Sequence, residues 1–112
     1  MNLCLGTDSL ASVNKVRGQH IELNLLTEMQ CLSASNPGLS PETLLLMGTM
    51  NSAKALGLQG KIGELSKKAS ADLIAVPFSG KLSDAPHAIV RHTGPVAASL
   101  IDGQWAIKPE LD

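Results

Sequence analysis

The sequence predicts an α+β chain in which a short strand is followed by helices and then by a small antiparallel sheet. Three observations predict this order. Residues 2–5 form a short apolar run, residues 21–56 carry apolar side chains at helical spacing, and an Asp-Gly pair at 102–103 separates two apolar runs. Helices and strands therefore occupy different parts of the chain.

The composition indicates a globular protein and excludes several classes of partner. The chain has 112 residues, of which 44% are hydrophobic and 17% are charged, which suits one domain. A net charge of −1 and an aromatic content of 2% provide neither a basic face nor side chains to stack on bases, so we expect no nucleic-acid partner. No apolar run approaches the ~20 residues of a membrane span, so we expect no membrane partner.

The cysteine usage and the N-terminus predict a cytoplasmic protein. Cys4 and Cys31 stand in apolar surroundings without CxxC spacing, which is typical of buried, reduced thiols. The N-terminus lacks a basic start followed by a long apolar stretch, so we expect no signal peptide.

The first helix is predicted over residues 21–35. Apolar side chains recur there at helical spacing: Ile21, Leu25, Met29 and Leu32. The helix should end at residues 36–38, because Pro37 disfavours a helical residue before it and Gly38 permits the turn.

A second helix should begin at Ser40, which suits the N-cap, with Pro41 at the first helical position. Residues 44–47 are apolar on nearly every side, so we expect this helix to be buried on more than one face. We expect Asn51 to cap a short helix running to residue 56, with Gly57 ending it at the C′ position.

The last third of the sequence predicts strands. Residues 72–77 form one strand candidate, and the weak alternation over 87–92 suggests another. The apolar runs 96–101 and 104–108 flank Asp-Gly, a pair that favours a type I′ hairpin because both central residues need positive φ.

The first strand and the residues after it raise a functional question. A buried strand at 2–5 without a neighbour would leave backbone groups unsatisfied, which suggests that the chain belongs to a longer protein. Asp8 follows this strand, a position where carboxylates bind metals or transfer protons. In the alternative interpretation, Asp8 caps the following loop together with Thr7 and Ser9.

Four segments occur in an order that resembles a known family. They are "LGTDSLAS", "SPETLLLMGTMNSAKALGLQGKIGEL", "ADLIAVPF" and "VAASLIDGQWAI". In this order they look like the end of the metal-dependent amidohydrolase superfamily, in its branch of aminohydrolases and chlorohydrolases that act on ring systems.

The resemblance implies an α/β fold in which this chain supplies the last strand and helices of a (β/α)8 TIM-type barrel and part of an appended small β-sandwich domain. Residues 1–60 would hold the barrel part and residues 61–112 the sandwich strands. A full barrel takes roughly 250 residues, so we expect a C-terminal fragment. The family has glycine where this chain has Lys68, so we expect a rebuilt loop over 66–70.

The resemblance also implies a mechanism for the complete enzyme. A zinc or iron ion activates water for hydrolysis of a C–N or C–Cl bond in a cyclic amidine-like or heterocyclic small-molecule substrate. Asp8 would be the metal ligand and proton shuttle, and Ser9 and His20 would lie near the substrate. Because a catalytic zinc takes three protein ligands, this chain alone should bind no metal and be inactive.

Two functions therefore remain open. The chain is either part of a metal-dependent hydrolase, with the missing barrel portion or a second copy as its partner, or a non-catalytic, free-standing interaction module that retains the family tail.

Overall fold

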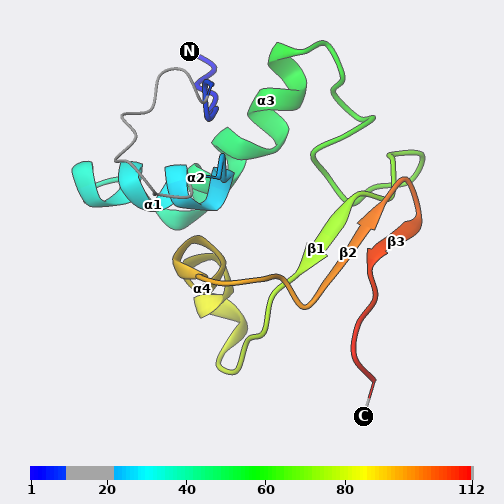
Figure 1. Ribbon diagram of the computed structural model, residues 1–112. Coiled ribbons are helices and arrows are strands. Elements are labelled where there is room, and N and C mark those ends of the chain that lie inside the picture. Colours follow the sequence, from blue (N-terminus) through cyan, green and yellow to red (C-terminus); the bar gives the residue numbers. More distant parts are fainter. Residues whose placement is uncertain (10–21, 112) are drawn as a thin grey trace.

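The computed structural model describes residues 1–9 and 22–111 and has the mixed helix and strand content that the sequence predicts. The elements follow in the order α1 (Leu25–Ser35), α2 (Pro41–Gly48), α3 (Met50–Ala55), β1 (Leu73–Ala75), the 3₁₀ turn η2 (Leu82–Asp84), α4 (Ala85–Arg91), β2 (Ala98–Ile101) and β3 (Gln104–Ile107). Figure 1 shows the helices gathered on one side and the sheet on the other.

Helix α1 begins four residues later than its apolar spacing predicts. Asn24 has an extended backbone, and its side chain accepts hydrogen bonds from the amides of Leu26 and Thr27. Asparagine is a strong N-cap because this bond satisfies amides that have no partner in the helix. The predicted end of the helix is confirmed, since Asn36 is its C-cap.

Helix α2 begins as predicted. The Ser40 hydroxyl accepts a hydrogen bond from the Thr43 amide at 3.1 Å, and Pro41 occupies the first turn. Leu44 and Met47 are buried but Leu46 is 44% exposed, so the expectation that the run is buried on nearly every side is wrong at that position.

The helical backbone is interrupted between α2 and α3 at Thr49, whose backbone is non-helical. Thr49, and not Asn51, is therefore the N-cap position of α3, and the predicted capping role of Asn51 is wrong. Asn51 lies inside the helix, where its side-chain amide donates a hydrogen bond to the Leu3 carbonyl, 48 residues away. The predicted stop is confirmed, because Gly57 takes a φ of 71° directly after the C-cap Leu56.

The principal core joins three helices. Met29 of α1, Leu44 and Met47 of α2, and Val90 of α4 form one buried cluster. Val90 thus packs a helix from residues 61–112 against helices from residues 1–60. The division of the chain into two domains at residue 60 stays a prediction.

The strand predicted over 87–92 is wrong, since these residues belong almost entirely to α4. Pro86 lies in the first turn of α4, a position that favours helix formation. A short apolar run does not distinguish a strand from a buried helix, and packing of Val90 against α1 and α2 decides for the helix.

The three strands form one antiparallel sheet in the order β1-β2-β3. Leu73 pairs with Leu100, and a bulge interrupts the pairing of β2 with β3 between Ser99 and Leu100. The predicted hairpin is confirmed, because Asp102 and Gly103 take φ values of 50° and 74°, as a type I′ turn requires.

Residues 2–5 have no regular secondary structure and do not form the predicted strand. Within the described ranges, the β ladders involve only β1, β2 and β3, so this segment has no strand partner there and contacts α2 and α3 instead. The expectation that both cysteines are buried is also wrong: Cys4 and Cys31 are free thiols on exposed residues.

The predicted rebuilding of the loop at 66–70 relative to the family stays a prediction. Lys68 has the left-handed backbone for which glycine is favoured, with a φ of 75°.

None of the helices in the described ranges has the length and hydrophobicity that crossing a bilayer requires.

Candidate functional site

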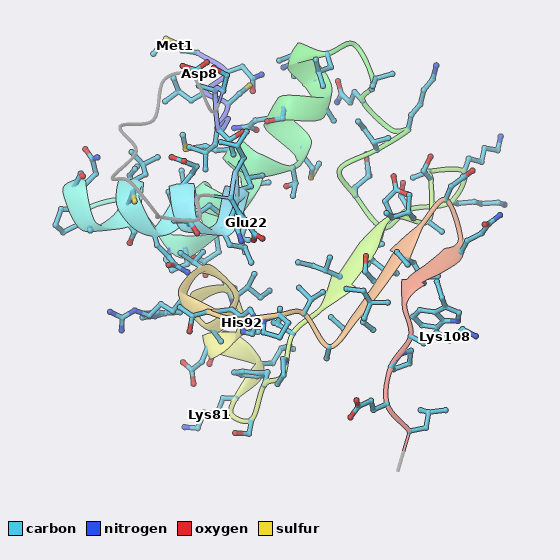
Figure 2. The ribbon with its side chains drawn as sticks, viewed as in Figure 1. Met1, Asp8, Glu22, Lys81, His92 and Lys108 are labelled. Atoms are coloured by element: carbon cyan, nitrogen blue, oxygen red, sulfur yellow. The ribbon has the colours of Figure 1, made fainter. Side chains whose placement is uncertain are left out.

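Asp8 stands three residues after Leu5, at the end of the first described segment. The residue is exposed, and its backbone takes a φ of 55°. Aspartate tolerates this left-handed conformation better than most residues do. Figure 2 places Asp8 at the same end of the molecule as Met1 and well away from His92 and Lys108.

Hydrogen bonds attach the segment before Asp8 to the junction between α2 and α3. The Leu5 amide donates to the Met47 carbonyl at 3.0 Å, and the Asn51 side-chain amide donates to the Leu3 carbonyl at 2.9 Å. In return, the Asn2 side-chain amide donates to the Asn51 carbonyl at 2.9 Å. The backbone that leads to Asp8 is thus held at several points.

The break between the two helices makes one of these bonds available. Because α2 ends at Gly48, the Met47 carbonyl has no helical partner and accepts bonds from outside the helix. It accepts from the Leu5 amide and also from the Ser52 hydroxyl at 2.7 Å. The local sequence therefore creates an acceptor where the first segment passes.

The described residues do not form a metal site by themselves. No group of three or more His, Cys, Asp or Glu side chains comes together in the part of the chain that the structure covers. A catalytic zinc ion takes three protein ligands. Asp8 could supply one of them, and the other ligands would have to come from elsewhere.

The other predicted site residues are distributed unevenly. Ser9 is exposed and adjacent to Asp8, whereas His20 lies outside the described residues. His87 is exposed on α4, and His92 is half-buried with its Nε2 atom 3.0 Å from the Pro95 carbonyl oxygen. The backbone carbonyl of His92 also accepts a hydrogen bond from the Gln30 side chain at 2.8 Å. These contacts of His92 link the end of α4 to α1 and to the following loop, which is a structural role.

A hollow of about 200 Å³ lies between β1 and α4. Its lining is apolar: Ile74, Val76, Phe78, Ala85, Ala88 and Ile89. These side chains offer neither a nucleophile nor a titratable group for catalysis in this hollow.

Asn51 is the residue whose role the sequence pattern did not reveal. Its position near the start of a short helix favours a cap, because asparagine is a preferred N-cap residue. Its actual partner, Leu3, is 48 residues away. The indication in the sequence was its place in the segment "TMNSA", one of those that carry the family resemblance.

Comparison with known proteins identifies the family. The model of the amidohydrolase family matches residues 1–106, which is nearly the whole chain. The chain therefore belongs to the amidohydrolase family. A crystal structure of an amidohydrolase aligns with 78% of this chain and 20% of its own, at a TM-score of 0.56 and 27% identity.

Two curated relatives show which members of the family the chain is similar to. The 5-methylthioadenosine/S-adenosylhomocysteine deaminase of Saccharophagus degradans is 39% identical over 93 residues, which cover 77% of this chain and 19% of the relative. The protein of the same name from Acetivibrio thermocellus is 39% identical over 83 residues, covering 68% of this chain and 18% of the relative. The chain thus spans about a fifth of the length of the relatives it matches.

Proposed function

We propose that this chain is the C-terminal part of a hydrolytic deaminase that removes the amino group from the heterocycle of a small substrate. The observation that carries the proposal is Asp8, an exposed carboxylate at the end of a segment fixed to two helices, in a chain of the amidohydrolase family. The names of the relatives favour an adenine nucleoside with a thioether substituent as the substrate, and C–N rather than C–Cl cleavage.

In this proposal Asp8 has two tasks in the complete enzyme. Its carboxylate would be one ligand of a zinc or iron ion, a group that would supply a water of lowered pKa. With such a group bound, the Asp8 carboxylate would be the group that takes up a proton and passes it to the leaving amine. A carboxylate suits both tasks, because it is an oxygen ligand and a proton acceptor. Ser9 and His20 remain proposed neighbours of the substrate.

The proposal also assigns the architecture. Residues 2–5 would be the last strand of a (β/α)8 barrel, whose active site lies at the carboxyl ends of its strands, and Asp8 follows that strand directly. The antiparallel sheet of β1, β2 and β3 would belong to an appended β-sandwich. What supports this assignment is the family match together with the order of the segments.

The test requires a complete active site, which a chimera supplies. In the deaminase of Saccharophagus degradans, the matching segment is replaced by that of this chain, and turnover of 5-methylthioadenosine is measured. We expect the chimera to be active. Asp8→Asn should lower kcat by roughly 10²–10⁴-fold, because asparagine offers an oxygen but takes no proton.

Asp84→Asn is the matched control, since Asp84 is also exposed but lies on η2 beside α4. It should leave turnover unchanged. A folded Asp8→Asn chimera that keeps more than about a tenth of its activity would contradict the proton-transfer role.

A second candidate is a non-catalytic interaction module. The observation that favours it is the exposure of large apolar side chains on the hairpin, with Ile101 at 61% and Trp105 at 49%. The chimera distinguishes the two functions: a folded, metal-loaded chimera without any deaminase activity would favour the module.

A further inference from the structure

We propose that Asn51 is a positioning residue for Asp8: its side-chain amide holds the backbone that places the Asp8 carboxylate. The proposal rests on the proposed function of Asp8 as an active-site carboxylate. Asn51 contributes through the segment it binds and has no contact with the reacting atoms in this proposal.

The first step of the argument is the reciprocity of the bonds. Asn51 donates from its side chain to the Leu3 carbonyl at 2.9 Å, while its own carbonyl accepts from the Asn2 side chain at 2.9 Å. The thiol of Cys4 lies 3.3 Å from the same carbonyl. One residue of α3 thus bonds to three consecutive residues of the segment.

The second step is the anchoring of Asn51 itself. It is half-buried within α3, and at the end of the preceding helix the Met47 carbonyl accepts a further bond from the Leu5 amide. The segment is therefore fixed on both sides of Cys4 by groups that belong to the helices. A pair of helices that pack against each other is a more rigid base than the segment alone.

The third step is the short distance in sequence between the last anchored residue and the carboxylate. Only Gly6 and Thr7 separate Leu5 from Asp8, and no Cβ at Gly6 would meet an atom within 4 Å. Because only two residues intervene, anchoring the chain at Leu5 limits the positions that the Asp8 carboxylate can take. A misplacement of about 1 Å in a catalytic group is enough to lower activity by roughly 10²-fold.

The test of the contact uses the 112-residue chain and the isosteric variant Asn51→Asp. Aspartate keeps the size of the side chain but cannot donate a hydrogen bond to the Leu3 carbonyl. We expect hydrogen exchange of the Leu5 amide to accelerate by about tenfold or more, whereas circular dichroism should show unchanged helix content. Asn2→Ala, at an exposed position, should act in the same direction.

Asn36→Ala is the matched control, because Asn36 also donates its side-chain amide to a backbone carbonyl, that of Leu32, but at the end of α1. It should leave exchange at Leu5 unchanged. Equal exchange of the Leu5 amide in Asn51→Asp and the unaltered chain would overturn the proposal.

The test of the positioning role uses the chimeric deaminase. Asn51→Asp should lower kcat by about 10–100-fold, the usual effect of losing a residue that orients a ligand, while KM changes by no more than about twofold. Unchanged kcat in a chimera with accelerated exchange would overturn the role in catalysis. An unaltered chimera without activity would instead contradict the proposed function, and exchange at Leu5 alone would then decide whether Asn51 holds the segment.

Discussion

At the scale of single residues, three non-glycine residues of the described ranges have a positive φ: Asp102 in the hairpin turn, Asp8 and Lys68. Asp8 and Lys68 lie outside the hairpin and differ in the role of their side chains. Asp8 and Lys68 have φ values of 55° and 75°. For Asp8 the conformation directs a proposed active-site carboxylate, and strained residues do cluster at such sites. Lys68 is an exposed loop residue at which the family resemblance implies a glycine, and no compensating role for its side chain is evident.

The backbone cost at Lys68 leads to a stability prediction. Lys68→Gly should raise the free energy of unfolding by about 1 kcal/mol, since a residue with a Cβ pays about this amount in the left-handed region. Denaturant titration followed by circular dichroism measures the change.

Lys67→Gly provides the control for this prediction. The substitution Lys67→Gly removes the same charge from the same loop, but Lys67 is not one of the positive-φ residues. Its replacement by glycine should be neutral or destabilising. Equal effects of the two substitutions would show that the charge, and not the backbone, determines the result.

At the scale of elements, the break at Thr49 organises the region around Asp8. It ends α2, frees the Met47 carbonyl for Leu5 and begins α3 with Asn51 in the first turn. Gly63, in the loop after α3, packs against this break: a Cβ at Gly63 would lie 2.8 Å from the Thr49 carbonyl oxygen. Gly63 therefore permits the loop after α3 to approach the helix junction closely.

This close approach predicts that Gly63→Ala is destabilising. The added methyl group meets backbone atoms that cannot move aside as a flexible side chain would. Besides the cost of the left-handed backbone, we expect a further loss of about 1–3 kcal/mol from overpacking. Thermal and denaturant unfolding measure the loss.

Gly57→Ala separates the two contributions. Gly57 has a similar φ of 71°, but a Cβ there would meet nothing within 4 Å. This control should cost only about 1 kcal/mol, the price of the backbone conformation. If Gly63→Ala proved no more destabilising than Gly57→Ala, the result would contradict the proposed packing against Thr49.

At the scale of the whole molecule, the core is small for the length of the chain. The radius of gyration is 15.2 Å, whereas a compact domain of this size has a value of about 13 Å. The buried apolar residues of the described ranges are Met29, Leu44, Met47, Ala53, Val90 and Ala98. Many large apolar side chains, among them Trp105 and Ile107 on the edge strand β3, remain exposed.

We therefore predict that the isolated chain self-associates or binds a complementary part of a barrel. Exposed strand edges pair with other chains, and apolar patches favour association. Light scattering at micromolar concentration should show species larger than 11.7 kDa. Trp105→Lys should reduce their proportion, because it places a charge on β3, whereas Lys108→Gln, just after the strand, should not.

A monomer with a cooperative melt would contradict this prediction. It would show that the chain forms a sufficient core alone, and it would favour the free-standing module over the part of a larger hydrolase.

The sequence by itself determined those features that depend on neighbouring residues. Ser40 caps α2, Gly57 ends α3 and Asp102-Gly103 forms the hairpin turn, because capping and positive φ are properties of a few adjacent residues. The family resemblance carried by the quoted segments is confirmed. It too could be recognised from the sequence, because a motif consists of neighbouring residues. Asp8 was visible as a candidate from its place after an apolar run.

Only the tertiary structure decided the features that depend on distant partners. Residues 85–91 form a helix because Val90 packs against α1 and α2, although their pattern suits a strand equally well. Residues 2–5 contact α2 and α3 and not a strand of the described ranges, through bonds to Met47 and Asn51. Asn51 bonds to Leu3 across 48 residues. Such contacts arise from the approach of separate elements, and the sequence around a single residue does not encode which element will approach it.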